Sequence, residues 1–243
     1  MDRLIYTAAS AARALMQRQD GLAHNLANAT TPGFRADQVA FRAVPVRGEG
    51  ATTRVVALEA SAGFDPRSGP VQSTGRELDV ALAGEGWFAL QTPEGNEAYT
   101  RHGGFEIGAD GTLQAGNGMA VAGEGGPIVV PPGMQVRIGS DGSVSAQGPG
   151  GVAQALGRLK LVNPPVAELR KGADGLVRMA GGDTADADAT LRVKSGALEG
   201  SNVSPVDAMV GMIAAARQFE TQMKLLQNAE QNDRQAAQLL GPT

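Results

Sequence analysis

Cysteine is absent from this chain, and aromatic residues are scarce. The 243 residues include no Cys, one Trp and two Tyr, and aromatic residues make up 4% of the total. Without cysteine the protein forms no disulfide bonds and performs no thiol chemistry, which leaves its compartment open. The shortage of Trp and Tyr also argues against an extracellular binding module or adhesin, because such a protein presents an exposed aromatic patch to its ligand.

Long apolar runs and a strong excess of one charge are absent as well. No run of 18 apolar residues exists, so we expect no membrane-spanning helix. The stretch after Met1-Asp2-Arg3-Leu4 is broken by Arg13 and Arg18 and lacks the apolar core of a secretory signal peptide. The net charge of −4 gives no electrostatic reason to expect binding to nucleic acid or acidic lipid.

The last part of the chain, residues 204–240, has the signals of one long helix. Ser204 can cap its start, Pro205 suits the first helical position, and Asp207 completes a capping-box spacing. Gly241-Pro242 is a helix stop. A helix of this length would extend about 54 Å at 1.5 Å per residue, far beyond the usual globular helix.

Apolar residues in this stretch recur at alternating steps of three and four, as in the a/d seam of a coiled coil. The seam residues are Met209, Met212, Ala216, Phe219, Met223 and Leu226. It continues with Glu230, Asp233, Ala237 and Leu240, so it becomes polar before its end. Burying each large side chain contributes about 1.5–3 kcal/mol. The pattern therefore predicts that this helix packs against a partner.

The N-terminal stretch has the same spacing and predicts a helix from about residue 4 to about residue 28. Its seam consists of Ile5, Ala8, Ala12, Leu15, Gln19, Leu22 and Leu26. Thr30-Thr31-Pro32-Gly33 would end the helix. Because alanine dominates this seam, another helix can approach closely. The two terminal helices could pack on each other in an ordinary globule, or they could pack against other subunits.

The middle of the chain, residues 34–202, predicts antiparallel β structure. Asp110-Gly111, Asp141-Gly142 and Asp174-Gly175 mark hairpin turns, because glycine tolerates the positive φ of such turns. We expect strands at 55–58, 79–82, 87–91, 128–130, 135–138, 156–161 and 191–193. The chain is thus predicted to be α+β, with an N-terminal helix and exit motif (1–33), an extended arm (34–76), a β-rich domain (77–202) and a C-terminal helix (203–243).

The sequence offers little chemistry. Residues 148–153 fit G-x-G-x-x-A, but the flanks are strand-like and Pro149 lies inside, so we interpret the segment as a glycine-rich turn. Asp183, Asp186 and Asp188 lack the glycine and final Glu of a calcium loop. We predict no catalytic residue, no cofactor site and no metal site.

Two histidines and three carboxylates are the remaining candidates for chemistry. His24 is interpreted as a structural or interface residue and His102 as part of a surface turn. Glu77 and Asp79 would point to the same face of a strand, and with Glu85 they are the carboxylates that a carbohydrate-active enzyme would use. Arg76 is adjacent, so a surface pair is favoured over an acid–base pair.

Several motifs resemble those of the bacterial flagellar rod and hook proteins. Asn25-Leu26-Ala27-Asn28-Ala29-Thr30-Thr31-Pro32-Gly33-Phe34-Arg35 matches the N-terminal signature in length and order, with His24 where the family usually has Asn. The further matches are Leu78-Asp79-Val80-Ala81-Leu82-Ala83-Gly84-Glu85-Gly86-Trp87-Phe88, Tyr99-Thr100-Arg101, Gly126-Pro127-Ile128 and Ser201-Asn202-Val203. The similarity looks greatest to the proximal-rod members, with the distal-rod protein as the alternative.

The resemblance implies a structural subunit of the basal-body rod, the shaft that transmits motor torque to the hook and so drives motility. It implies terminal helices that form a coiled-coil inner layer, an outer β domain, and export through the flagellar type III apparatus to the periplasm without a cleaved signal. The partners would be other copies and other axial proteins. Subunit packing would use the two seams, and the helix exit would use Asn25, Asn28, Pro32, Gly33 and Phe34.

Overall fold

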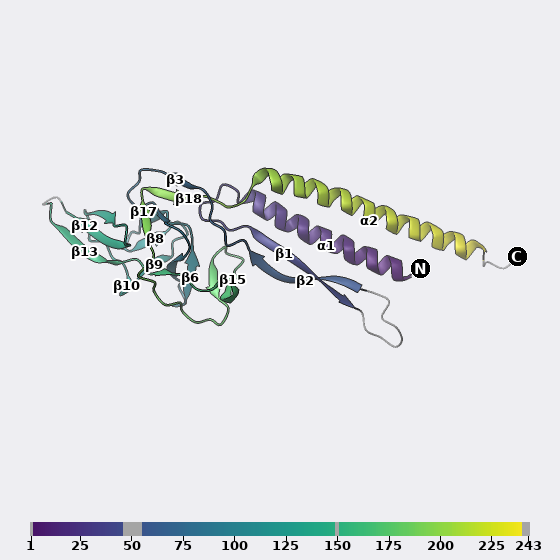
Figure 1. Ribbon diagram of the computed structural model, residues 1–243, viewed down its shortest axis with the longest axis horizontal. Coiled ribbons are helices and arrows are strands. Elements are labelled where there is room, and N and C mark those ends of the chain that lie inside the picture. The colour runs from purple at the N-terminus through teal and green to yellow at the C-terminus, as the bar shows by residue number, and fades with distance from the viewer. Residues whose placement is uncertain (1, 46–54, 149–150, 240–243) are drawn as a thin grey trace. The chain divides into compact units, whose positions relative to one another are not determined.

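The computed structural model describes residues 2–45, 55–148 and 151–239, and the predicted α+β class is confirmed: a long helix lies near each end of the sequence, and the middle is rich in strands. The chain divides into two compact units. We call residues 1–27, 37–64 and 204–243 the helical unit, and residues 28–36 and 65–203 the β unit. Each is described below by itself (Figure 1).

The helical unit contains two helices and one hairpin. Its elements are α1 (Asp2–Ala27), β1 (Asp37–Pro45), β2 (Val55–Phe64) and α2 (Pro205–Leu239). Both helices agree with the ranges expected from sequence. The predicted cap at the start of α2 is present, because the amide of Asp207 donates to the hydroxyl of Ser204 at 3.3 Å. The predicted stop at Gly241-Pro242 lies outside the described residues.

Helix α1 packs beside α2 (Figure 1) through stripes of small side chains. Ala8 and Ala12 are buried on α1, and Ala208, Ala215 and Ala229 are buried on α2. The half-buried residues of the same α2 stripe are Met212, Phe219, Gln222 and Leu226. This stripe differs by one residue from the predicted seam at three positions, where Ala208, Ala215 and Gln222 are more buried than Met209, Ala216 and Met223. Met209 and Met223 are left exposed.

Two glycines allow this unit to pack closely. A Cβ atom at Gly211 of α2 would lie 3.1 Å from Cδ1 of Leu22, and one at Gly21 of α1 would lie 3.0 Å from Cγ2 of Val39 in β1. Both distances are shorter than an ordinary van der Waals contact. Glycine inside a helix costs about 1 kcal/mol relative to alanine, and here the close approach of α2 and of the β1–β2 hairpin offsets that cost.

The β unit consists of short antiparallel strands. Its elements are β3 (Val71–Ser73), β4 (Val80–Leu82), β5 (Trp87–Gln91), β6 (Glu97–Thr100), β7 (Phe105–Ile107), β8 (Leu113–Ala115), β9 (Ala120–Gly123), β10 (Gly126–Pro127), β11 (Gln135–Ile138), β12 (Ser143–Gln147), β13 (Ala153–Arg158), β14 (Leu161–Val162), the 3-10 turn η1 (Val166–Glu168), β15 (Leu169–Lys171), β16 (Val177–Met179), β17 (Val193–Ser195) and β18 (Ala197–Glu199). The largest sheet has nine strands and the order β15-β16-β6-β5-β9-β8-β7, with β10 on β9 and β14 on β5.

The three Asp-Gly pairs form the predicted hairpin turns. They join β7 to β8, β11 to β12 and β15 to β16, and Gly111, Gly142 and Gly175 have φ between 79° and 84°. In each turn the Asp side chain accepts a hydrogen bond from the amide two residues later. All three fit Gly-x-Asp-Gly-x-[Leu/Val], so the turn is a recurring local motif.

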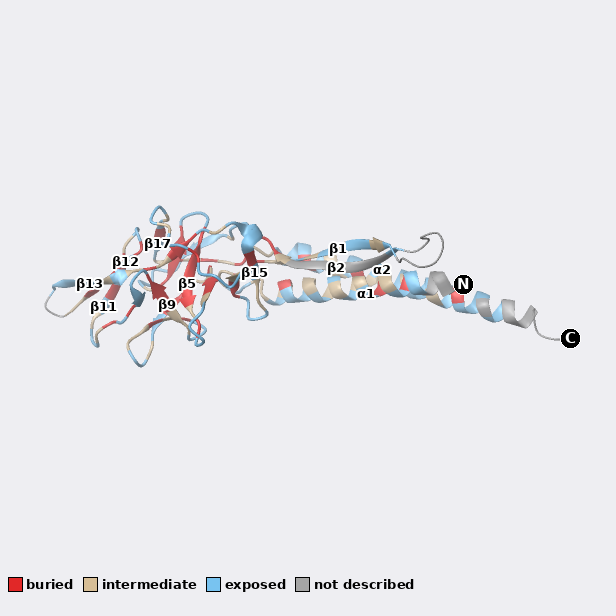
Figure 2. Cartoon of the chain, turned by 90° about the horizontal axis from the view of Figure 1, so that it is seen from below, coloured by how far each residue is buried: buried red, intermediate tan, exposed pale blue. Residues whose placement is uncertain are grey.

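Three of the expected strands differ in detail. The strand expected at 191–193 begins only at Val193, as β17 (Val193–Ser195). Residues 156–161 do not form one strand, because β13 pairs with β12 and ends at Arg158, whereas β14 pairs with β5. Residues 128–130 make only an isolated bridge, between Val129 and Thr112. The core of the unit is apolar, and the ring centroids of Phe88 and Phe105 lie 5.3 Å apart in an edge-to-face contact. Figure 2 shows the buried residues of this unit in red, among them those of β5 and β9.

Candidate functional site

The residues predicted to pack between subunits all lie on the two helices. On α1, Ala8 and Ala12 are buried and Leu15, Leu22 and Leu26 are half-buried, while the side chain of Ile5 lies outside the described residues. On α2, Met212, Ala216, Phe219 and Leu226 are half-buried, and Met209 and Met223 are exposed. Several predicted positions therefore face α1 within the chain, and the two exposed Met residues remain available to another molecule.

The first half of the predicted exit motif fastens α1 to β1. The buried Asn25 side chain accepts a hydrogen bond from the amide of Asp37 at 2.7 Å and donates to its carbonyl at 3.0 Å. Nδ1 of His24 lies 2.5 Å from Oδ2 of the same Asp37. Asn25 therefore hydrogen-bonds the backbone groups of the first residue of β1. His24 has the structural role that was predicted.

The second half of the motif forms a tight turn in the β unit. The carbonyl of Asn28 accepts from the amide of Thr31 at 3.1 Å, and its side chain accepts from the Thr31 hydroxyl at 3.1 Å. Pro32 is half-buried and Gly33 has a φ of 70°. The Phe34 ring is buried, and Nζ of Lys171 lies 3.8 Å from its centroid, a cation–π contact. Phe34 thus anchors this segment within the β unit.

We expect Gly33→Ala to destabilise the β unit strongly, while Gly75→Ala destabilises it by only about 1–2 kcal/mol. A Cβ at Gly33 would lie 2.3 Å from the amide nitrogen of His102, whereas one at Gly75 meets nothing within 4 Å. The two glycines have similar φ, 70° and 74°, so the cost of a left-handed backbone, about 1–2 kcal/mol, is common to both. Thermal unfolding of the two variants measures the difference, and equal melting temperatures would contradict the steric explanation.

A buried triad of charged residues, Arg35, Arg101 and Glu199, lies next to this turn. Oε1 of Glu199 accepts a hydrogen bond from Nη2 of Arg35 at 2.6 Å, and Oε2 lies 3.3 Å from Nε of Arg101. The amide of Gly69 donates to Oε1 at 2.8 Å. All three side chains are 1–2% exposed. Two buried guanidinium groups therefore share one buried carboxylate. The hydrogen bonds to Glu199 are needed to offset the cost of removing these charges from water.

The indole ring of Trp87 completes the surroundings of the triad. The guanidinium carbons of Arg35 and Arg101 lie 5.8 and 6.0 Å from the centroid of the ring, within the range of cation–π attraction. Nε and Nη1 of Arg35 and Nη1 of Arg101 form no hydrogen bond within the described part of the chain. Burial lowers the pKa of Arg101 to about 10, so this side chain stays charged at neutral pH.

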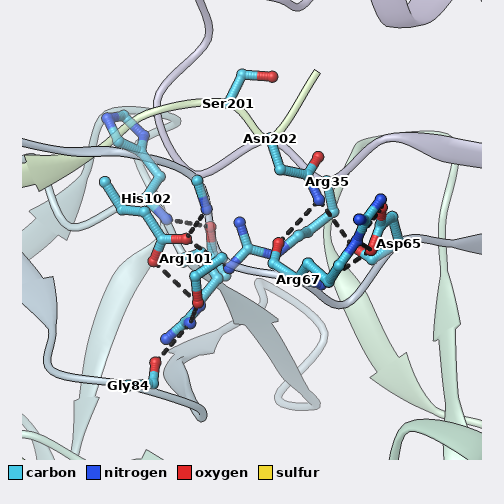
Figure 3. Close-up of polar contacts among 12 residues, drawn as sticks. Arg35, Asp65, Arg67, Gly84, Arg101, His102, Ser201 and Asn202 are labelled. Carbon is cyan, nitrogen blue, oxygen red and sulfur yellow. Dashed lines mark hydrogen bonds and ion pairs between the residues drawn. The ribbon is translucent and has the colours of Figure 1, made fainter. Parts of the chain in front are cut away.

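A second set of polar contacts ties further segments to the triad (Figure 3). The Asn202 side chain accepts from the amide of Ala36 at 2.7 Å and donates to the carbonyls of Asp65 and Arg67 at 3.0 and 2.8 Å. The Arg67 side chain hydrogen-bonds to the Asp65 carboxylate and holds its pKa below the usual value. We call Arg35, Asp65, Arg67, Arg101, Glu199 and Asn202 the junction cluster.

The junction cluster gathers every segment through which the chain passes between its two units. Residues 28–36, 65–69 and 199–203 all continue in sequence into the helical unit, and each contributes hydrogen bonds to the cluster. Arg101 adds a fixed point in the body of the β unit, because its Nη2 donates to the carbonyl of Gly84 and to the hydroxyl of Ser68. The arrangement is suited to holding chain segments rigidly, not to chemical reaction.

This cluster is not predicted by the sequence alone. Arg35, Trp87 and Arg101 belong to motifs that were recognised, but no pattern in sequence brings them together, and Glu199 carried no signal of its own. The only sequence feature that could have indicated the cluster is a charged residue, Glu199, at the end of a short strand and directly before Gly200-Ser201-Asn202.

Two other expectations need correction. Asp79 is 4% exposed, and its Oδ1 atom lies 3.4 Å from Nη1 of Arg76. Glu77 and Asp79 are therefore not a surface pair. His102 is half-buried, its ring lies close to the Cα atoms of Gly104 and Gly116, and desolvation lowers its pKa. It is not a simple surface turn residue, because the neighbouring glycines leave room for its ring.

Three segments of the chain match known flagellar families. Residues 5–35 match the family described as flagella basal body rod protein, residues 81–146 match the flagellar hook protein FlgE/F/G D1 domain, and residues 194–239 match the flagellar basal body rod FlgEFG protein C-terminal family. One member of the buried triad lies in or at the end of each match.

Curated relatives match over the whole length. The chain is 45% identical to flagellar basal-body rod protein FlgF of Salmonella typhimurium and 46% identical to that of Escherichia coli, with 99% of each chain covered. It is 32% identical to flagellar basal-body rod protein FlgG of Bacillus subtilis, over 95% of this chain and 96% of the relative. The chain belongs to the family of flagellar basal-body rod proteins.

Membership in the rod protein family confirms the main functional prediction. The protein is a structural subunit of the flagellar basal body and not an enzyme, which excludes both the carbohydrate-active enzyme and the adhesin. Within the family, its identity of 45–46% to the FlgF proteins of Salmonella typhimurium and Escherichia coli exceeds its identity of 30–32% to the FlgG proteins of Bacillus subtilis and Buchnera aphidicola. FlgF proteins of Caulobacter vibrioides and Buchnera aphidicola are also 30–32% identical to it. No described helix of this rod protein is long and apolar enough to cross a membrane.

Proposed function

We propose that this chain forms part of the proximal rod and helps to transmit torque along it. The observation that carries the proposal is identity of 45–46% to two FlgF proteins over 99% of the chain. In this role α1 and α2 pack with helices of neighbouring axial subunits in a coiled-coil-like inner layer, and the β unit forms an outer layer.

The proposed subunit contacts use the two helical seams. Long helices provide stiffness because their backbone hydrogen bonds are internal. The residues predicted for this packing are Ile5, Ala8, Ala12, Leu15, Leu22 and Leu26 of α1 with Met209, Met212, Ala216, Phe219, Met223 and Leu226 of α2. Ala8 and Ala12 are already buried within the chain, so the proposed contacts with neighbours are made by the other members. The exposure of Met209 and Met223 supports contacts beyond the chain, because large apolar side chains gain stability when they are covered.

The exit motif is proposed to carry load where the chain leaves α1. Asn25 holds the first residue of β1, and Asn28, Pro32, Gly33 and Phe34 form a turn fixed in the β unit. The junction cluster then holds the three connecting segments by buried, charge-assisted hydrogen bonds, which are stronger and shorter than neutral ones. We infer that torque passes through these fixed segments without bending them.

Assembly would follow export in an unfolded state through the flagellar type III apparatus, with the rod built in the periplasm. Cryo-electron microscopy of isolated basal bodies tests the proposed location. Density that fits this β unit and these helices is expected in the proximal shaft. Basal bodies from a strain lacking the gene, with an unchanged proximal shaft, would contradict the proposal.

Before assembly, we expect the free monomer to have an ordered β unit and weakly protected helices. The stripes between α1 and α2 are rich in alanine, and each alanine buries little apolar area, whereas ordering each residue costs about 1–2 kcal/mol of backbone entropy. Folding of the helices would then be coupled to assembly. Amide hydrogen exchange on dilute monomer checks this, with β5 (Trp87–Gln91) as the internal reference. Protection of both helices equal to that of β5 would refute it.

A further inference from the structure

One face of α2 is apolar without being covered. Val206, Met209, Val210 and Ile213 are 64%, 46%, 61% and 55% exposed. Val206 and Ile213 each lie two residues before a buried alanine of the α1-facing stripe, which places them roughly 160° around the axis from that stripe. The first turns of α2 are therefore apolar on both sides, a pattern typical of a helix that is buried all round. We call Val206, Met209, Val210 and Ile213 the ridge.

A groove of about 470 Å³ lies elsewhere on the same unit. Helices α1 and α2 and the strand β1 line it, mainly with apolar groups. Its lining includes Ala14, Leu15 and Arg18 of α1, Phe41 of β1, and Gln218 and Gln222 of α2. The volume accommodates several aliphatic side chains.

Charges at the two surfaces are opposite. Arg18 lines the groove and is exposed, and Glu220 lies two turns after Ile213 on nearly the same face of α2 and is also exposed. Neither side chain forms an ion pair with a residue that the structure describes. Contact between a ridge and a groove would bring one unpaired charge of each sign together and so favour this register over others.

We propose that the ridge of one copy of this chain inserts into the groove of a second copy. This inference rests on the proposed rod function and names the contact by which neighbouring copies join. The ridge and the groove are different surfaces, so the contact is heterologous. When two copies are joined, one of them still has a free groove and the other still has a free ridge. Such contacts build open helical assemblies when the rotation does not close a ring, as a shaft requires.

Photo-crosslinking in assembled basal bodies tests the contact. A photoreactive residue replaces Ile213 in the full-length chain, in cells that also make a tagged wild-type copy. The expected products join position 213 of one copy to residues 14–18 or 218–222 of the other, as mapped by mass spectrometry. The matched control carries the probe at Asn232, which is exposed on α2 but turned roughly 100° from Ile213 and lies about five turns further along the helix, and is expected to give no crosslink to the groove.

A charge exchange provides a second measurement. Arg18→Glu is expected to lower the yield of the 213–groove crosslink several-fold, because Glu220 then faces a like charge. Adding Glu220→Arg is expected to restore the yield. Failure of this rescue, with both proteins assembled, would overturn the proposed register.

The outcomes separate the inference from the proposed function. If the chain is present in basal bodies but position 213 crosslinks to a different axial protein, to another ridge or to nothing, the inference is wrong and the rod function stands. If the chain is absent from basal bodies, the proposed function fails and the inference fails with it.

Discussion

Ala216→Pro is expected to abolish swarming motility while leaving the β unit folded. Residue 216 lies inside α2, where proline removes the hydrogen bond to the carbonyl of Met212 and clashes with the preceding turn, at a cost of about 3 kcal/mol or more. The resulting kink would turn the contact stripe after Phe219 away from α1. Swarming in soft agar measures the effect, and circular dichroism of the purified protein reports on the β unit.

The matched control is Ala216→Gly. It keeps the backbone amide and costs about 1 kcal/mol in a helix, so we expect rods to assemble and cells to swim. Motile cells whose rods contain the proline variant would refute the role assigned to α2. Loss of motility in both variants would instead indicate that the side chain at this position, and not the continuity of the helix, is what matters.

Glu199→Gln is expected to lower the free energy of unfolding of the β unit by about 3–5 kcal/mol. The substitution removes the only anion shared by Arg35 and Arg101 within the triad and leaves two guanidinium groups buried at 2% exposure. An amide can still accept one hydrogen bond, but it cannot balance either charge. Urea denaturation followed by the fluorescence of Trp87, the single Trp of the chain, measures the loss directly beside the triad.

Glu124→Gln is the control for this prediction. Glu124 pairs with Arg158 at the same 3.3 Å distance as the Arg101–Glu199 pair, but its side chain is 43% exposed. Exposed pairs contribute about 0–1 kcal/mol because solvent screens them. Comparable losses of unfolding free energy in the two variants would show that burial is not the reason why the triad stabilises the β unit.

Much of the fold followed from local signals that act at short range in the chain. Ser204, Pro205 and Asp207 located the start of α2 because a helix cap needs only residues three apart. The Asp-Gly pairs located three hairpins for the same reason, since the positive φ of the glycine and the Asp hydrogen bond are both local. The face of α2 that contacts α1 could be predicted only to within one residue. Periodicity does not distinguish Ala208 and Ala215 from Met209 and Ala216 as the residues that contact α1.

The junction cluster could not be predicted, because its members are brought together only by the folded β unit. Arg35 and Glu199 are 164 residues apart, and neither residue type predicts burial, since charged side chains are usually exposed. The motifs containing Arg35, Trp87 and Arg101 were recognised as a family signature. Their physical role emerged only when the distances to one carboxylate were known.

The discontinuity of the helical unit has a consequence for the order of folding. Its pieces come from the beginning, the early part and the end of the chain, with the β unit inserted between them. A chain that emerges N-terminus first presents α1 before any partner exists and delivers α2 last. The β unit is complete once residue 203 is available, so it can fold before α2 is present to pack against α1. Joining α1 to α2 then closes a loop that is already compact, at a lower entropic cost than a disordered loop of the same length.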